Sequence, residues 1–524
     1  MGIQGKPSYL YILWASAVLT AGALGLPLVY LAIRTVGAGP GVLELMFNSR
    51  TLNLLLRTLG LVAAVTSASL ALTLPLAWLT AYSDLPFRRT WTVLAVLPLV
   101  IPSYVGAFTF ISAFGPRGML QQLLEGPLGI ERLPDIYGFP GAFLVLTLCS
   151  YPYLFLTVRG ALVSLDPALE EASRSLGHST ASTLWNITLP QLRPAMASGG
   201  LLVALYTLRD FGAVSMLQYN VFTRVIYVQY QTAFDRTYAA ALSLVLVAIS
   251  IIILVLETRT RQSVYYRSDS ASSRPRATVP LGPWKWPALV FCGGLMALAL
   301  GVPAATISYW LVRGFRAGEA LNMAWLPAWN SFHASAAAAI VAGLAALPVA
   351  YLVVRRPGLF SKGLERLTYI GYALPGVAVG LALVFFGANY ATRLYQTLGM
   401  LILAYMIQFV PQAVGAIRAR LLQINPRFEE AARTLGHDGM QVLATITWPL
   451  ARPGLMAGVA LVFLTAMKEL PITLMLGPTG FDTLATRVWS ATQEAFFARA
   501  AVPALLLIVV SSLSIAGLIN RMER

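Results

Sequence analysis

The sequence predicts an all-α polytopic membrane protein built from two parallel halves of about six transmembrane helices each. Three observations carry this prediction. Hydrophobic residues make up 57% of the chain and charged residues 11%, whereas soluble proteins carry about 25% charged residues. The apolar runs are repeatedly about 20 residues long, the length at which a helix crosses a bilayer. A long polar stretch of the first half also recurs in the second half.

Twelve apolar runs are predicted as transmembrane helices, because continuous apolar runs indicate helices and lipid admits no open strand edges. The first run is longer than the core of a signal peptide, so we expect it to be an uncleaved span. The expected spans are approximately 8–33, 53–82, 92–114, 140–160, 199–218, 238–257, 286–311, 331–354, 367–388, 398–418, 456–477 and 501–520.

The basic residues indicate how these spans are oriented. With both termini in the cytoplasm, the inside segments hold about twice as many Lys and Arg residues as the outside loops, which is the positive-inside pattern. The net charge of +16 is therefore explained by topology. We expect no nucleic-acid partner.

The chain is expected to divide into a first half (1–257), a cytoplasmic linker (258–285) and a second half (286–524). The linker is Ser-rich and basic, which is typical of a flexible segment that lies near anionic lipid. Each half holds an even number of spans, so the halves share one orientation. Matching residues lie 273 positions apart early in the halves and 259 apart later, which indicates an insertion in the outside loop 115–139.

The repeated polar stretch covers 166–194 and again 425–453. Each copy starts at Asp166 or Asn425, residue types that cap the first turn of a helix. Each is expected to end that helix at a glycine, in a left-handed turn. A second short helix is then predicted, with a proline break at position 190, or 449 in the second copy, before the next span.

These two copies resemble the cytoplasmic signature of ABC importer permeases. The matching motifs are Glu171-Ala172-Ser173-x-x-x-Gly177 with Ile187-Thr-Leu189-Pro190, and Glu430-Ala431-Ala432-x-x-x-Gly436 with Ile446-Thr-Trp448-Pro449. Ser173 departs from the pattern's second Ala, and Trp448 from its Leu. In that family the loop forms a coupling helix that sits in a groove of the ATPase. The resemblance implies a type I ABC importer permease fold in the bacterial inner membrane, and coupling roles for Glu170, Glu171, Ala172, Gly177, Glu429, Glu430, Ala431 and Gly436.

The energy source is expected on a separate protein. The chain has four lysines, and none of them completes the glycine-rich loop that cradles nucleotide phosphates. The resemblance therefore implies two copies of a cytoplasmic ABC ATPase that hold ATP and Mg, together with an extracytoplasmic substrate-binding protein and the lipid bilayer. We expect the chain itself to bind no cofactor, to hold no catalytic residue and to be no enzyme.

Two pairs of charged residues fall inside predicted spans at equivalent positions, Arg209-Asp210 and Lys468-Glu469. Charges at such depth cost about 2.5–3.5 kcal/mol each, so they usually face the protein interior or water. Adjacent helical residues do not face each other. The repeat offers the pairs Arg209 with Glu469 and Lys468 with Asp210, which we expect to form a gate or line a pathway. A structural clamp or outward snorkelling are the alternatives.

Residues around these charges, including Phe481 to Val488, look like the ferric-iron branch of the family, in which one chain carries both halves. Ferric iron prefers oxygen ligands. Tyrosines gathered near the outer ends of the spans offer them, although such residues also anchor proteins at the membrane interface. Thiamine, polyamine or phosphonate import stays open, as does a proton-coupled secondary transporter. The oxygen-bearing candidates are Tyr206, Tyr219, Tyr227, Tyr230, Asp235 and Tyr238.

The histidines and cysteines predict no metal site and no disulfide. Both cysteines, Cys149 and Cys292, lie in apolar runs at positions that the repeat does not relate. His178 and His437 follow the coupling glycines and are expected to belong to the docking surface or to be solvated. His333 has no counterpart in the repeat.

Overall fold

The computed structural model describes residues 8–37, 39, 44, 46, 48–232, 236–268, 278–318 and 324–522. Within these residues the chain forms helices and connecting turns, and the only β-pairing is one isolated bridge between Ser83 and Val279. The predicted all-α class is therefore confirmed.

The helices fall into two compact units, each of which contains residues of both sequence halves. Unit 1 consists of Met1–Met46, Ile226–Val247 and Asn322–Arg487, and unit 2 of Phe47–Val225, Ala248–Leu321 and Val488–Arg524. Three helices contribute residues to both units, namely α12 (Phe222–Thr232), α13 (Thr237–Ser268) and α24 (Leu484–Gln493).

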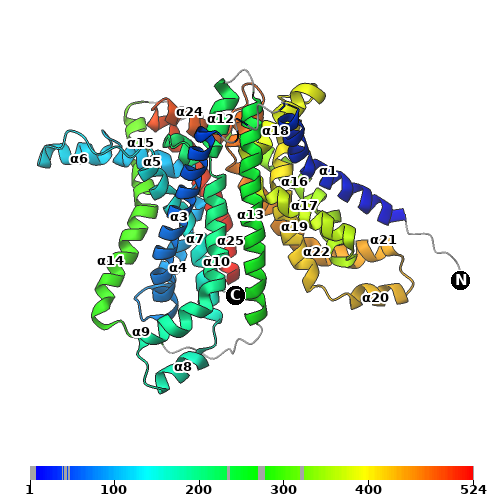
Figure 1. Cartoon of the computed structure of the whole chain (residues 1–524), viewed down its shortest axis with the longest axis horizontal. Coiled ribbons are helices and arrows are strands. Elements are labelled where there is room, and N and C mark those ends of the chain that lie inside the picture. Colours follow the sequence, from blue (N-terminus) through cyan, green and yellow to red (C-terminus); the bar gives the residue numbers. More distant parts are fainter. Residues whose placement is uncertain are drawn as a thin grey trace. The chain divides into compact units, whose positions relative to one another are not determined.

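In unit 2 the long helices α3 (Ser49–Tyr82), α7 (Phe139–Ser164) and α10 (Leu189–Arg209) pack against one another (Figure 1). The other helices of this unit are α4 (Arg88–Val96), η1 (Leu97–Val100), α5 (Ser103–Phe114), α6 (Met119–Leu128), α8 (Pro167–Ser175), α9 (Thr180–Thr183), η2 (Leu184–Thr188), α11 (Gly212–Met216), η3 (Gly282–Trp284), α14 (Lys285–Met296), η4 (Ala297–Gly301), α15 (Val302–Arg316) and α25 (Phe497–Met522).

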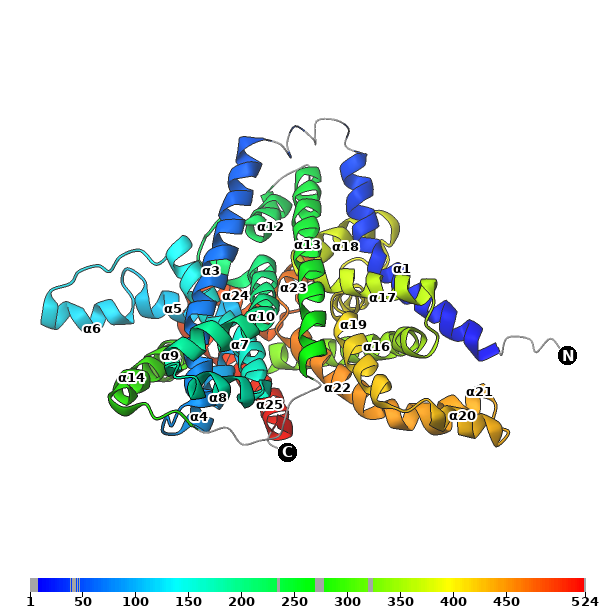
Figure 2. The ribbon, with the colours of Figure 1, turned by 60° about the horizontal axis from the view of Figure 1, so that its bottom comes forward.

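Unit 1 repeats this core with α16 (Trp325–Arg355), α19 (Leu398–Gln423) and α22 (Trp448–Met467). Figure 2 shows α19 leading from the region of α18 towards α20, which lies beyond its end. The other helices of this unit are α1 (Ser8–Val36), α17 (Leu359–Ala373), α18 (Gly376–Tyr390), α20 (Arg427–Thr434), α21 (Gly439–Val442), η6 (Leu443–Thr447) and α23 (Pro471–Leu476).

A helix near the start of each sequence half packs with elements of the other half. α1 opens the first half but packs on α16, α17 and α18 of the second. α15 belongs to the second half but packs on α5, and also on α25. The compact units are therefore not the same residues as the two repeats.

The predicted linker 258–285 is partly helical. α13 continues to Ser268, and a short turn of 3-10 helix, η3, leads into α14. Residues 269–277 of the predicted linker lie outside the described residues, as do Lys6 and Asp235.

Several of the twelve predicted spans are interrupted or shorter than expected in the structure. Among the described residues, eight helices are long and apolar enough to cross a membrane, or nine if one bent pair is a single span. That pair, Arg88–Val100 with Ser103–Leu128, bends by 98°. The described apolar helices Gly376–Tyr390 and Phe497–Ser512 are shorter.

Proline explains two of the interruptions. Pro102 and Pro375 both adopt extended backbone angles directly before α5 and α18. Proline also restricts the residue before it to extended conformations, so α17 ends at Ala373 and η1 ends at Val100. The breaks occupy equivalent repeat positions, inside the predicted spans 92–114 and 367–388.

Candidate functional site

A side-chain oxygen holds the start of the first short helix in each polar stretch. The Asp166 Oδ1 accepts a hydrogen bond from the backbone N–H of Ala168 at 3.0 Å. Before α20, the Asn425 Oδ1 accepts one from the N–H of Arg427, also at 3.0 Å. Such bonds satisfy backbone donors that the first turn of a helix leaves free. Both residues therefore make the bond that the sequence predicts.

The two coupling glycines end these helices in the left-handed region, as predicted. Gly177 has a φ of 89° and Gly436 a φ of 92°. Their N–H groups donate to the carbonyls of Arg174 and Arg433 at 3.0 and 3.1 Å. A Cβ added at either glycine would meet no atom of this chain within 4 Å. A substitution there is therefore opposed by backbone conformation, not by crowding within this chain.

The predicted proline break after the second short helix is wrong. α9, η2 and α10 continue one another through Pro190, and α21, η6 and α22 do the same through Pro449. In both copies the helix widens to a π turn just before the proline, where the N–H of Leu189 bonds the carbonyl of Leu184. A π turn accommodates a residue that the regular ladder cannot take, and the proline then sits in the first turn of the next segment.

One carboxylate ties α8 back to the membrane helices. Glu170 is only 5% exposed. The Thr188 hydroxyl donates to Glu170 Oε1 at 2.8 Å. The Tyr82 hydroxyl, at the end of α3, lies 3.4 Å from the same oxygen and 3.1 Å from the carbonyl of Leu162. Its single hydrogen is therefore shared between two acceptors.

The equivalent carboxylate holds α20 through a charged partner. Glu429 is 4% exposed, and the Thr447 hydroxyl donates to its Oε1 at 3.0 Å. The Arg355 Nε, at the end of α16, donates to the same oxygen at 2.8 Å. Another nitrogen of Arg355 donates to the carbonyl of Ile424 at 3.0 Å. Arg355 stands 273 positions after Tyr82, so the repeat relates the two partners.

The eight residues predicted for coupling therefore separate into two groups. Glu170 and Glu429 point into the protein and position the short helices. The other six side chains or glycines are exposed on α8 and α20 or at their ends: Glu171, Ala172, Gly177, Glu430, Ala431 and Gly436.

Exposed apolar side chains accompany these six residues at equivalent positions. Leu176 and Leu435 are 79% and 81% exposed, and Leu169 and Phe428 are 54% and 58% exposed. Large apolar side chains left in water beside polar ones are typical of a surface that a partner covers. Sequence reasoning did not single out these four residues, nor Tyr82, Arg355, Thr188 and Thr447. The two threonines were visible within the repeated motif, and the offset of 273 relates the other two.

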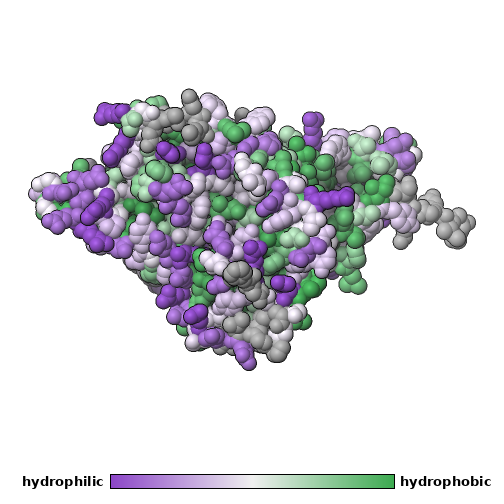
Figure 3. All heavy atoms as spheres, turned by 90° about the horizontal axis from the view of Figure 1, so that it is seen from above, coloured by the Kyte–Doolittle hydropathy of each residue, from purple (hydrophilic) through white to green (hydrophobic). Residues whose placement is uncertain are grey.

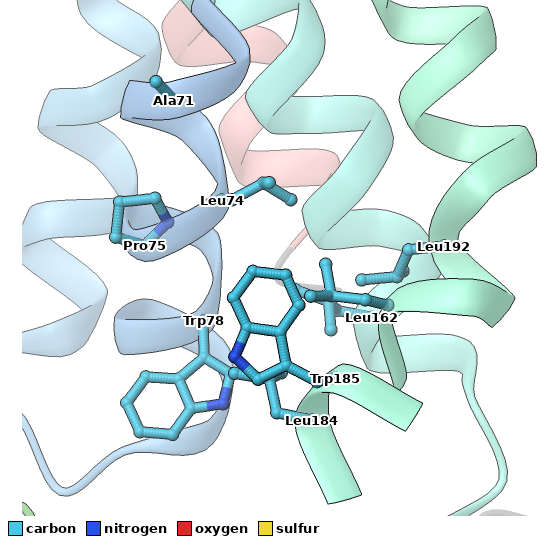
Figure 4. A pocket seen from close by; sticks show the side chains of 9 residues that line it. Ala71, Leu74, Pro75, Trp78, Leu162, Leu184, Trp185 and Leu192 are labelled. Atoms are coloured by element: carbon cyan, nitrogen blue, oxygen red, sulfur yellow. The ribbon is translucent and has the colours of Figure 1, made fainter. Parts of the chain in front are cut away.

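An apolar pocket of about 360 Å³ adjoins the first of these segments (Figure 4). Trp78 of α3 and Trp185 of η2 lie at one end of it, and Leu162 of α7 forms part of its wall. The same turn of helix thus supplies Thr188 to Glu170 and Trp185 to the pocket. The remaining lining residues are Ala71, Leu74, Pro75, Leu184, Leu189 and Leu192.

The four charged residues predicted for a gate lie where helices end. Arg209 is the last residue of α10 and Lys468 follows α22, so the predicted spans 199–218 and 456–477 are interrupted there. The Asp210 Oδ1 accepts hydrogen bonds from the N–H groups of Ala213 and Val214 at 3.0 and 3.4 Å. Asp210 therefore caps α11.

Glu469 caps α23 in the same way as Asp210 caps α11. Its Oε1 accepts a hydrogen bond from the N–H of Ile472 at 3.3 Å. Gly376 lies so near that a Cβ there would be 2.7 Å from this oxygen. In the other copy, Ser103 stands at the position of Gly376 and hydrogen-bonds Asp210. Each carboxylate thus meets the start of two helices, where partial positive charge favours an anion.

The candidate oxygen ligands are not brought together as one cluster. Tyr206 packs against Tyr153 in unit 2, with ring centroids 5.4 Å apart, and Tyr219 packs against Phe139. Tyr227 and Tyr230 instead belong to unit 1.

The described residues contain no group of three His, Cys, Asp or Glu side chains that could hold a metal ion. His178 and His437 are exposed beside the coupling glycines, as expected. The Nδ1 of His333 lies 3.0 Å from the carbonyl of Trp329 one turn earlier.

Long apolar helices with duplicated polar segments at their ends define a multi-pass membrane transport component. The chain belongs to the family of binding-protein-dependent transport system inner membrane components, whose model matches residues 74–264 and again 338–524. The chain therefore carries two fused permease halves, as the sequence predicts.

Relatives extend over nearly the whole chain. The Fe(3+)-transport system permease protein FbpB 2 of Haemophilus influenzae is 35% identical over 503 residues, which cover 95% of this chain and 96% of that protein. The ferric transport system permease protein FbpB of Actinobacillus pleuropneumoniae is 26% identical over 73% of this chain and 58% of its own length. The molybdenum transport system permease protein ModB of Mycobacterium tuberculosis is 30% identical over 38% of this chain and 74% of its own length.

Proposed function

We propose that this chain is the permease subunit of an ATP-driven importer that takes ferric iron from an extracytoplasmic binding protein. The observation that carries the substrate is the 35% identity, over nearly the full length of both chains, to a permease named for Fe(3+) transport. The similarity to a molybdenum permease covers only 38% of the chain, so it supports the shared machinery more than a shared cargo.

The coupling role is proposed for the exposed surfaces of α8 and α20. One ATPase subunit would cover each of them, with ATP and Mg held by that subunit. The exposed leucines and glycines at equivalent positions support this role, because both surfaces present the same side chains to a partner. Glu170 and Glu429 would pass the movement of each short helix to α3 and α16 through the bonds described above.

We further propose that both termini, α8 and α20 lie on the cytoplasmic side of the inner membrane. The excess of basic residues in the segments next to these elements supports this orientation. A cysteine introduced beside Gly177 should react with a membrane-impermeant thiol reagent only after the cells are opened. Labelling of intact cells would contradict the orientation.

The charges at the helix breaks are proposed to contribute to a gate or pathway. Breaks that expose polar groups inside a membrane protein are tolerated where they face protein or a water-filled cavity. The repeat predicts that Asp210→Lys is rescued by Lys468→Asp. Loss of transport in both single variants with recovery in the double variant supports the pairing. Absence of recovery contradicts it.

Docking is tested by co-purification of the ATPase with the tagged chain. Leu176→Asp with Leu435→Asp should weaken the complex at least about tenfold, because a charge then replaces an apolar contact at the centre of the interface. Leu123→Asp is the matched control, since Leu123 is 71% exposed on α6, in the loop that is predicted to lie on the outer side of the membrane. An ATPase that co-elutes equally with all three proteins would contradict the proposed docking surface.

Cargo is tested in proteoliposomes that contain the permease, its ATPase and the cognate binding protein. Radioactive iron presented on the binding protein should enter only when ATP reaches the ATPase. Excess thiamine, polyamine or phosphonate should not compete. Uptake that follows a proton gradient without ATP would instead indicate a secondary transporter.

A further inference from the structure

Three phenol groups of unit 1 lie together although they come from separate parts of the chain. Tyr227 and Tyr230 lie one turn apart on α12, and Tyr395 lies in the turn between α18 and α19. Tyr230 lies near enough to both Tyr395 and Tyr227 for their phenol groups to interact. The sequence pattern singles out Tyr227 and Tyr230 but not Tyr395, because Tyr395 stands far from these two residues in the chain.

Two more polar groups complete this phenol cluster. Gln231 donates from its Nε2 to the Tyr227 hydroxyl at 2.7 Å, which leaves its carbonyl oxygen as a further hard donor. The Arg236 guanidinium lies over the Tyr230 ring, 4.6 Å from the centroid.

The cluster lies at the end of unit 1 that is opposite to the coupling helix. Tyr395 precedes the first residue of α19, and α20 begins shortly after the last residue of α19. A helix of 26 residues is about 39 Å long at 1.5 Å per residue, which is more than the thickness of the hydrocarbon core. Figure 3 views the chain from above and shows hydrophilic side chains exposed among hydrophobic ones on that face.

We infer that Tyr227, Tyr230 and Tyr395 form a transient ferric-ion site at the entrance to the transport path. The inference rests on the proposed function. Fe³⁺ is a hard ion that prefers oxygen donors, and three phenols with one amide oxygen supply them where the binding protein would release its cargo. The remaining positions would be filled by water or by donors of the binding protein.

A phenol is protonated at neutral pH, since its ordinary pKa is about 10. A ferric ion must therefore displace a proton from each phenol that it binds, and those protons pass to solvent. A transport site needs binding that is weak enough for the ion to move on.

The test uses the purified transporter, with its ATPase, titrated with ferric citrate. Ferric ion bound to phenolate absorbs visible light, so the wild-type complex should develop a visible band that Ga³⁺ abolishes by competition. Tyr230→Phe with Tyr395→Phe keeps both rings and removes only two oxygens. This double variant should lose the band. Its iron uptake from the loaded binding protein should fall at least about tenfold, the loss typical of disturbed metal ligation.

Tyr390→Phe is the matched control, because Tyr390 ends α18 nearby and is 73% exposed. It should keep both the band and the uptake rate. Iron uptake at the wild-type rate by the double variant would overturn this inference alone. A wild-type transporter that carries no iron would overturn the proposed function and the inference with it.

Discussion

The two coupling helices share a sequence pattern but are held by different chemistry. α8 is fixed by Glu170, which accepts a hydrogen bond from Thr188 and a long one from Tyr82. α20 is fixed by Glu429, which accepts from Thr447 and forms a buried ion pair with Arg355. Two copies of one motif can therefore keep the same geometry although Arg355 offers a cation to one carboxylate where Tyr82 offers a hydroxyl to the other.

This difference concerns the strength of attachment. A hydrogen bond to a charged group contributes about 1.5–3 kcal/mol, and each carboxylate receives one from a threonine. Glu429 also receives the Arg355 bond at 2.8 Å, whereas the Tyr82 oxygen lies 3.4 Å from Glu170. Removal of one partner from a buried ion pair costs more, because it leaves the other charge buried alone. We therefore expect α20 to be the more firmly held helix and also the one more sensitive to loss of its partner.

The largest effect is expected from Arg355→Met. Its side chain is 9% exposed and that of Glu429 is 5% exposed. The variant leaves the buried carboxylate with the half-exposed Arg433, 3.7 Å away, as its remaining ion-pair partner among the described residues, at a cost that approaches the roughly 3–5 kcal/mol of a broken buried pair. Hydrogen exchange of the α20 amides should accelerate strongly while that of α8 stays unchanged. Equal acceleration in both helices would show that the ion pair supports the whole fold and not α20 in particular.

A smaller and unequal effect is expected when each carboxylate becomes an amide. Glu429→Gln removes the charge from the Arg355 bond and should cost about 1.5–3 kcal/mol, whereas Glu170→Gln weakens the bonds from Thr188 and Tyr82 and should cost about 1 kcal/mol. Thermal unfolding of the two purified variants, together with ATPase activity stimulated by the binding protein, measures the difference. Equal losses would remove the distinction drawn between the two anchors.

Both short helices share a hydrogen bond from a threonine hydroxyl to the buried carboxylate, so the loss of this bond should have the same effect on α8 and on α20. Thr188→Val and Thr447→Val each remove one hydroxyl donor to the carboxylate, at 2.8 and 3.0 Å, and each should cost about 1.5 kcal/mol, the lower end for a hydrogen bond to a charged group. Exchange at α8 in the first variant should match exchange at α20 in the second. A much larger loss at Thr447 would mean that the ion pair cannot hold Glu429 without it.

The smallest effect is expected from Tyr82→Phe. The hydroxyl lies 3.4 Å from Glu170 and shares its hydrogen with the carbonyl of Leu162, so its loss should cost about 0.5 kcal/mol, at the weak end for a hydrogen bond. Coupled ATPase activity should stay close to that of the wild type. A loss as large as that of Arg355→Met would refute the asymmetry.

Local features of the site were readable from the sequence. The caps at Asp166 and Asn425 and the turns at Gly177 and Gly436 depend on one residue and its immediate neighbours, so residue type was sufficient. The continuous helix through Pro190 was not foreseen, because a π turn depends on how the helix packs as well as on the proline itself.

The sequence by itself determined the helical membrane class, the two fused halves and the coupling motif, because hydrophobicity, span length and a duplicated polar pattern are properties of the chain alone. Only the tertiary structure decided that Glu170 and Glu429 face inwards, that Tyr82 and Arg355 receive them, and that Tyr395 joins Tyr230. A short helix with adjacent glutamates does not indicate which of them turns inwards. That choice depends on partners far away in the chain, which only packing brings near.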